Sequence, residues 1–295
     1  MKKINVKPDF QGFISKLFIK KPVLLWVLAF LSTGVWATPP LVSKQQIGMF
    51  KNSITCVVLE GESISYNVFI KEAVEKYWKA TTFEFIDHQE FEKRRTDSKY
   101  SFIVLLKEVW DKDPGGVSYD YLSLLMGGTA KELNQMPELI TLPISYTDNK
   151  NMDYGFVIPT MVKFMQKHAK NLETKRFMIS LNGLKYYNTS RVFKDKVLIL
   201  NKEDMAPSVD NAEKIKAVYP FYFKFMTVTE LQNELLTDPT NTLFLFHVGP
   251  GENSGAGKCF EMIFDVYGNL YYYSYRNVTN QDKNGFTTGN FRNLR

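Results

Sequence analysis

Histidine and cysteine are the side chains of this sequence best suited to nucleophilic, acid–base or metal chemistry. The three histidines, His88, His168 and His247, are far apart, and none lies within a few residues of a cysteine, so their spacing predicts no metal site. His247 differs from the others because it closes an apolar run directly before a glycine-rich stretch, and strand ends beside loops often carry functional residues. A hydrogen-bonded structural role is the alternative for His247.

The glycine-rich stretch from Gly249 to Lys258 has the composition of a phosphate-binding loop but not its spacing. The motif requires glycine at position 252, where Glu252 stands, and Ser or Thr after the lysine, where Cys259 stands. A β-hairpin is expected to follow, so the helix N-terminus that would hold a phosphate is missing. The sequence therefore predicts no nucleotide or other cofactor, and this stretch is expected to be a loop equivalent to Trp110–Gly116.

Cys56 and Cys259 have two interpretations. In an oxidising compartment the two residues can form one disulfide; alternatively both are unpaired core residues, since free cysteine is often buried. Cys56 begins the apolar run that continues through Val57 to Leu59, which fits a core strand. With so few cysteines the core has to be stable by itself, and the chain is long enough for that.

The first 37 residues have the pattern of a removable signal peptide. A lysine-rich start precedes the apolar run that begins at Val23, and Val35 and Ala37 fit the −3 and −1 positions of a cleavage site. Cleavage is expected after Ala37, with Thr38 as the new N-terminus. An uncleaved anchor helix is the alternative, but Val23 to Ala37 falls short of the about 20 apolar residues that span a membrane.

The net charge of +6 belongs mainly to this N-terminal segment. Six of the 37 basic residues and one of the 31 acidic residues lie in residues 1–37, so the remaining chain carries a net charge of +1. Binding to nucleic acid depends on a clustered excess of Lys and Arg. The sequence therefore predicts no nucleic-acid partner.

Two halves of the chain show the same order of predicted elements at an offset of 140 residues. Val57 to Leu59 falls on Val197 to Ile199, and each half reads as strand, helix, strand, short helix, strand and hairpin. Asp87 and Thr227 are the predicted N-caps of the two short helices, each with Glu three residues further on. Few residues are identical, so the order of elements carries the similarity.

The predicted fold is α/β (α+β), with two tandem similar β-α-β-α-β-β-β modules joined by a helical linker. After the signal peptide at 1–37, the first module is expected at 38–150, a helical connector at 151–195 and the second module at 196–295. The connector contains an amphipathic helix from Asp153 to Leu172. We interpret the repeated order as an internal duplication.

In its order of elements, each half resembles the small α/β domain found at the N-terminus of the TolB translocation protein and in the curli secretion channel protein CsgG. The resemblance covers residues 56–146 and 196–279 and rests on element order rather than on a motif. It implies a binding or scaffold module of the cell envelope without catalysis. The apolar N-terminal segment and aromatic-rich body also resemble the uncharacterised exported proteins of Bacteroidetes.

These features predict an exported, non-enzymatic binding or scaffold protein of the cell envelope, either periplasmic or extracellular. Its partner is expected to be another envelope protein or a glycan, with no stable membrane insertion after signal removal. The alternative function is a secreted hydrolase with a site near His247 and the glycine loops. If the two modules form a groove where they meet, its candidate lining residues are Trp110, Phe246, His247 and Tyr271.

Overall fold

The computed structural model describes residues 42–61, 63–109, 116–147, 154–179, 181–250, 256–279 and 284–295. The predicted signal peptide and its cleavage point lie outside these residues, as do residues 110–115 and 251–255 of the two predicted glycine loops. The described residues belong to one compact unit. Within them, no helix has the length and apolar character needed to cross a membrane.

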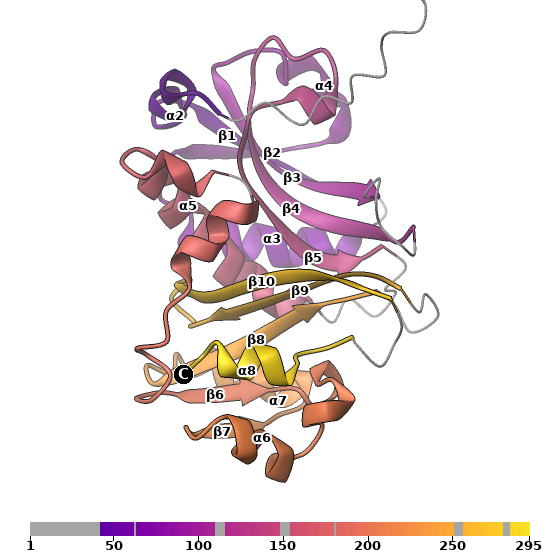
Figure 1. Cartoon of the computed structure of the whole chain (residues 1–295). Coiled ribbons are helices and arrows are strands. Elements are labelled where there is room, and N and C mark those ends of the chain that lie inside the picture. The colour runs from indigo at the N-terminus through magenta and orange to yellow at the C-terminus, as the bar shows by residue number, and fades with distance from the viewer. Residues whose placement is uncertain are drawn as a thin grey trace, which may run out of the picture. The chain divides into compact units, whose positions relative to one another are not determined.

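The chain has a mixed α/β fold built on two five-stranded sheets (Figure 1). Sheet A contains β1 (Ile54–Val58), β2 (Thr82–Ile86), β3 (Tyr100–Val109), β4 (Ser118–Met126) and β5 (Glu138–Tyr146). Sheet B contains β6 (Val197–Leu200), β7 (Phe223–Phe225), β8 (Thr242–Val248), β9 (Gly257–Phe264) and β10 (Leu270–Val278). The predicted fold class is confirmed.

Both sheets have the same topology. The strand order is β2-β1-β3-β4-β5 in sheet A and β7-β6-β8-β9-β10 in sheet B. The first three strands of each sheet are parallel, and the last two are added antiparallel. Helices α3 (Ile64–Tyr77) and α4 (His88–Arg94) connect the parallel strands of sheet A, and α6 (Ala212–Val218) and α7 (Val228–Leu236) connect those of sheet B.

The offset of 140 residues does not hold at every strand. Val58 pairs with Ile86 while Leu198 pairs with Phe223, so the connection from β6 to β7 is three residues shorter than its counterpart in sheet A. One reason is that α6 has 7 residues where α3 has 14. Helix α7 has 9 residues against 7 in α4, so the connection from β7 to β8 is longer than its counterpart in sheet A. This greater length offsets part of the earlier shortening.

The short helices begin where the capping pattern predicts. The Asp87 side chain accepts a hydrogen bond from the backbone N–H of Glu90 at 2.8 Å and caps α4. Thr227 and Glu230 form a complete capping box at the start of α7. Both N-cap predictions are confirmed.

The described residues also form the α-helices α2, α5 and α8. Helix α5 (Ile158–Leu172) is the predicted connector helix, but it begins later than Asp153, after a 3₁₀ turn over Gly155–Val157. Pro159 lies in its first turn, a position that proline favours. The capped helices α2 (Lys44–Phe50) and α8 (Thr288–Arg292) were not predicted, because each is too short to show a clear apolar period.

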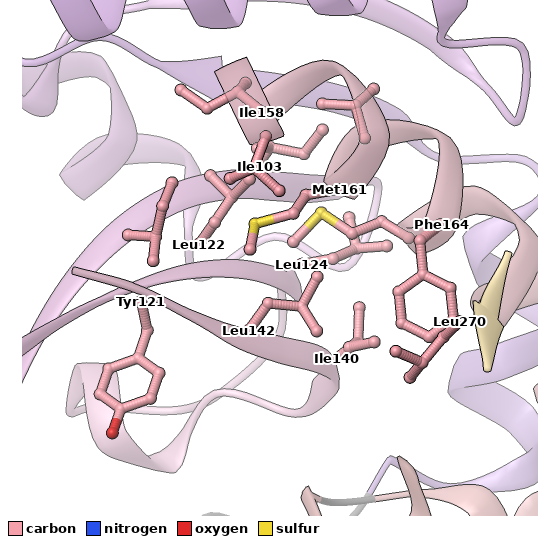
Figure 2. Close-up of a cluster of buried hydrophobic side chains, with 14 of the residues drawn as sticks. Ile103, Tyr121, Leu122, Leu124, Ile140, Leu142, Ile158, Met161, Phe164 and Leu270 are labelled. Carbon is pink, nitrogen blue, oxygen red and sulfur yellow. The ribbon is translucent and has the colours of Figure 1, made fainter. Parts of the chain in front are cut away.

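Helix α5 packs against elements of both modules. Its apolar side chains lie over sheet A, as Figure 2 shows for Met161 near Leu122 and Leu124 and for Phe164 near Ile140. The Phe164 ring also makes an edge contact with Phe264 of β9, with ring centroids 5.6 Å apart. One hydrophobic core therefore includes residues of sheet A, α5 and sheet B.

The two sheets also meet through a hydrogen-bonded tyrosine. The hydroxyl of Tyr119 on β4 accepts a hydrogen bond from the backbone N–H of Lys258 on β9 at 2.7 Å and donates to the Lys258 carbonyl at 2.9 Å. The rings of Tyr119 and Tyr121 make edge contacts with Phe260, at centroid distances of 5.7 and 6.1 Å. This contact fixes β9 against sheet A.

We predict that Tyr119→Phe lowers the free energy of unfolding by about 1–3 kcal/mol, because two buried backbone groups of Lys258 lose a hydrogen-bond partner. Chemical denaturation measures the change. Tyr186→Phe is the matched control, since the side chain of Tyr186 is exposed. An effect of Tyr119→Phe no larger than that of the control would contradict the role given to this hydroxyl.

Candidate functional site

Of the residues proposed to line a groove, Trp110 lies outside the described residues. Phe246 and His247 are neighbours on β8 and therefore face opposite sides of sheet B. Phe246 packs in the shared core, 5.9 Å from the ring of Phe156, and the Tyr271 hydroxyl donates to Asp265 at 2.9 Å. Among the described residues, Phe246, His247 and Tyr271 do not line one groove.

The two cysteines lie in different sheets and form no disulfide in this structure. Cys56 on β1 and Cys259 on β9 are both buried and free. Each thiol lies beside a carboxylate: the Cys56 Sγ atom is 3.7 Å from Glu84, and the Cys259 thiol donates to Oε1 of Glu261 at 3.2 Å. The structure therefore agrees with the interpretation of both cysteines as unpaired core residues.

Strand register brings Cys259 to His247. His247 on β8 pairs with Glu261 on β9, and Cys259 lies two residues before Glu261 on the same face of the strand. The His247 Nδ1 atom is 3.7 Å from the Cys259 Sγ atom. One side-chain atom from each of the three residues lies within 4.8 Å of the other two. We call His247, Cys259 and Glu261 the His–Cys–Glu cluster.

Glu261 is fully buried, and strand β10 satisfies its carboxylate. Arg276 forms an ion pair with Oε1, and the Ser274 hydroxyl donates to Oε2 at 2.5 Å. Arg276 also donates to the carbonyl of Gly285. A buried carboxylate is tolerated only when it is paired and hydrogen-bonded, so these contacts hold the Glu261 side chain in one position.

The chain's C-terminal segment holds the other side of His247. The side chain of Asn284 lies beside the imidazole and favours its protonated form. Gly249 lies against both groups, because a Cβ atom there would be 2.8 Å from His247 Nε2 and 2.3 Å from Asn284 Oδ1. The segment is itself anchored, since the N–H of Phe286 donates to the Asp204 carbonyl at 2.7 Å.

The surroundings keep both His247 and Cys259 uncharged near neutral pH. Burial, together with the positive charge of Arg276, lowers the pKa of His247 to about 4, although hydrogen bonds to Asn284 and to the backbone of Phe260 act in the opposite direction. Burial raises the pKa of Cys259 to about 11, although Arg276 favours the thiolate. The cluster therefore presents a neutral imidazole and a protonated thiol beside the Glu261 carboxyl group, which contacts Arg276.

Two kinds of chemistry use this set of groups. A thiol, an imidazole and an amide, here Cys259, His247 and Asn284, are the nucleophile, base and orienting group of cysteine hydrolases. Such a nucleophile has to reach its substrate and reacts as the thiolate, whereas Cys259 is fully buried and protonated. The sulfur, nitrogen and oxygen atoms of the His–Cys–Glu cluster are also ligand types that hold a metal ion.

A second candidate site is a surface hollow of about 420 Å³ beside α5. Residues at the end of α2, after α3 and along α5 and its C-terminal end line this hollow, which we call the lysine-lined hollow: Phe50, Lys51, Lys79, Ala80, Gln166, Lys167, Lys170 and Glu173. The lining thus includes four lysines and one glutamate. At neutral pH the hollow carries net positive charge.

The lysines of this hollow differ in their partners. Lys51 forms an ion pair with Glu173 at 2.8 Å, and Lys167 donates to the Tyr267 carbonyl at 2.8 Å. In the part of the chain that the structure describes, Lys79 and Lys170 have no carboxylate within 4.0 Å. Their ammonium groups are available to an anionic ligand.

Comparison of the chain with protein-family models, curated proteins and solved structures finds no match. The resemblance to TolB and CsgG therefore stays a prediction. Among the site residues, sequence reasoning selected His247 but not Cys259 or Glu261 as its neighbours. The sequence shows that Cys259 and Glu261 alternate on one predicted strand. It does not show the strand register that places them beside His247.

We predict that His247→Gln reduces the loss of stability in acid. The folded chain holds His247 neutral down to a pKa of about 4, whereas an unfolded chain protonates histidine near pH 6.5. Between these values the unfolded state binds more protons, so the wild type loses stability as the pH falls, and the variant lacks this contribution. Denaturant unfolding at about pH 7 and about pH 5 measures the difference.

His168→Gln is the comparison variant, because burial lowers the pKa of His168 to about 4 as well. Each variant is expected to show a smaller change between the two pH values than the wild type. A loss of stability that the substitution causes equally at both pH values cancels in that difference. A His247→Gln variant with the full pH dependence of the wild type would show that the folded chain does not depress this pKa.

Proposed function

We propose that this protein is an exported, non-enzymatic binding protein of the cell envelope that uses the lysine-lined hollow to hold an acidic part of another envelope component. The observation that carries the proposal is the concentration of four lysines around one concave surface, in a chain whose charge beyond residue 37 is almost balanced. Complementary charge steers an acidic partner to such a surface and fixes its orientation.

Hydrogen bonds between elements support the hollow as a preformed site. The Gln166 side chain on α5 accepts from the backbone N–H of Lys79 at 2.9 Å and donates to the Tyr77 carbonyl at 2.9 Å. The rings of Phe50 and Trp78 also make an edge contact, with their centroids 6.3 Å apart. A site that is held in place before binding loses less conformational entropy when its partner arrives.

Burial of the His–Cys–Glu cluster favours a binding function over the alternative of a secreted hydrolase. Cys259 and Glu261 have no exposed surface, so a substrate reaches neither side chain without movement of the surrounding chain. The partner that fits the lysine-lined hollow is an acidic surface of another envelope protein or an acidic glycan. The pattern of residues 1–37 supports export to the periplasm or the cell surface.

The matching strand order of the two sheets supports an internal duplication as part of this proposal. In this history one α/β module was copied, and the connector with α5 evolved between the copies. Only the first module and the connector supply residues of the lysine-lined hollow. The copies would then have diverged in function, with the second module free to carry a different site.

We predict that the double substitution Lys79→Glu and Lys170→Glu weakens binding of acidic polymers about tenfold or more at low salt, because it reverses the charge of the two unpaired lysines. Poly-L-glutamate and polygalacturonate, measured by fluorescence anisotropy or calorimetry, distinguish protein-like from glycan-like partners. Lys131→Glu with Lys194→Glu is the matched control, since both lysines are exposed, lie outside the hollow and undergo the same charge change.

Equal losses in the two double variants would contradict the assignment of binding to the hollow. Circular dichroism and thermal unfolding of each variant confirm that the fold is retained. Turnover of glycans, esters or peptides by the purified chain, abolished by His247→Ala, would contradict the non-enzymatic proposal and favour a hydrolase.

We predict that the protein isolated from its host begins near Thr38, because signal peptidase is expected to cleave after Ala37. N-terminal sequencing or intact-mass measurement of the periplasmic and extracellular fractions tests this expectation. Recovery of an intact Met1 in the membrane fraction would show instead that the N-terminal segment is an uncleaved anchor.

A further inference from the structure

We infer that His247, Cys259 and Glu261 form a binding site for one zinc ion, with a water molecule as the fourth ligand. This inference is independent of the lysine-lined hollow and of the acidic partner proposed above. It rests on the distances within the His–Cys–Glu cluster, on the groups that orient its three side chains and on its charge.

The spacing of the donor atoms is close to that of a tetrahedral zinc site. With Zn–S near 2.3 Å, Zn–N near 2.0–2.1 Å and Zn–O near 2.0–2.2 Å, the tetrahedron has edges of about 3.5–3.7 Å from sulfur to nitrogen or oxygen. The cluster has 3.7 Å between Cys259 Sγ and His247 Nδ1 and 3.2 Å between Cys259 Sγ and Glu261 Oε1. The donor atoms of His247 and Glu261 lie within 4.8 Å of each other. Rotation of one side chain is therefore enough to bring all three donor atoms to bonding distance of one ion.

The groups around the cluster are those that commonly orient metal ligands. A metal-bound histidine usually bonds its other ring nitrogen to a protein group, and Nε2 of His247 and Oδ1 of Asn284 both lie against Gly249 here. Ligand carboxylates are held in the same way, and Ser274 and Arg276 hold Glu261. Donors on neighbouring strands of one sheet also keep a fixed separation.

The charge of the cluster suits a divalent cation. Zinc binding replaces the proton of the Cys259 thiol, which is released to solvent as the zinc–sulfur bond forms. The thiolate and the Glu261 carboxylate then contribute two negative charges, and Arg276 contributes one positive charge. Burial raises the pKa of the nearby Asp204 to about 7, so its carboxyl adds negative charge only in part at neutral pH. The net charge of −1 on the donor groups and Arg276 favours a cation at this position.

The donor types select zinc among common cellular cations. Calcium and magnesium prefer oxygen ligands, whereas a thiolate with an imidazole favours zinc and similar transition metals. The surroundings of Cys56 provide an internal comparison. Cys56 also lies beside a carboxylate and a guanidinium, from Glu84 and Arg94, but no histidine joins them among the described residues.

The site would join the two ends of a loop. His247 lies near the end of β8 and Cys259 near the start of β9, so the ion would connect the strands just before and just after the stretch that contains the glycines. A metal ion bound to the folded state but not to the unfolded chain stabilises the folded state. The expected consequence is a more stable second module, not a new reaction.

Cobalt titration of the purified, metal-stripped chain tests the site, because Co²⁺ replaces zinc and reports thiolate ligation by absorption. We expect one equivalent of Co²⁺ to give tetrahedral d–d bands and a thiolate-to-cobalt charge-transfer band, both removed by one equivalent of Zn²⁺. Cys259→Ser should abolish the charge-transfer band, and His247→Ala should weaken binding at least tenfold. Cys56→Ser, the matched control, should retain both bands and the wild-type affinity.

Absence of stoichiometric Co²⁺ or Zn²⁺ binding by the wild type would overturn the inference. A charge-transfer band that survives Cys259→Ser would do the same. Should Cys259→Ser fail to fold, zinc-edge X-ray absorption of the Cys56→Ser protein decides the question. One sulfur at about 2.3 Å supports the site, and nitrogen and oxygen ligands alone exclude it. None of these results bears on binding at the lysine-lined hollow.

Discussion

Strand β9 is buried at all eight of its positions, and the arrangement of the second module follows from this burial. One face of the strand places Phe260, Met262 and Phe264 in the core shared with sheet A. The other face carries Cys259 and Glu261, whose polar groups have no access to water and must be satisfied within the protein. The same strand therefore provides both the apolar contact between the sheets and the need for a polar network behind it.

Helix α5 has a comparable double role for the first module. Its apolar side packs on sheet A and reaches Phe264, whereas Gln166, Lys167 and Lys170 on its other side line the lysine-lined hollow. An amphipathic helix links these two roles, since the burial of one stripe determines where the opposite stripe is displayed. The position of the lysines is therefore set by core packing rather than by the surface alone.

The fold could be predicted from the sequence to a large extent, and the site could not. Runs such as Val57–Leu59 and the capping pairs at Asp87 and Thr227 are local signals, and local signals determine the order of the elements. The cluster around His247 depends on strand register and on a C-terminal residue, Asn284, that is distant in sequence. Such contacts are decided by packing between elements, which no local pattern encodes. The same limit explains why the constant 140-residue offset fails at β7, where a shorter helix changes the connection.

The C-terminal segment has a consequence for the order of events during synthesis. Asn284 and Gly285 contact His247 and Arg276, and Phe286 forms a β-bridge to Met205, which follows β6. Residues 284–286 follow β10 in the chain, so the strands that carry Glu261 and Arg276 are synthesised before the segment that contacts them. Until residues 284–286 dock, the charged pair is open to water on that side, and their docking completes its burial.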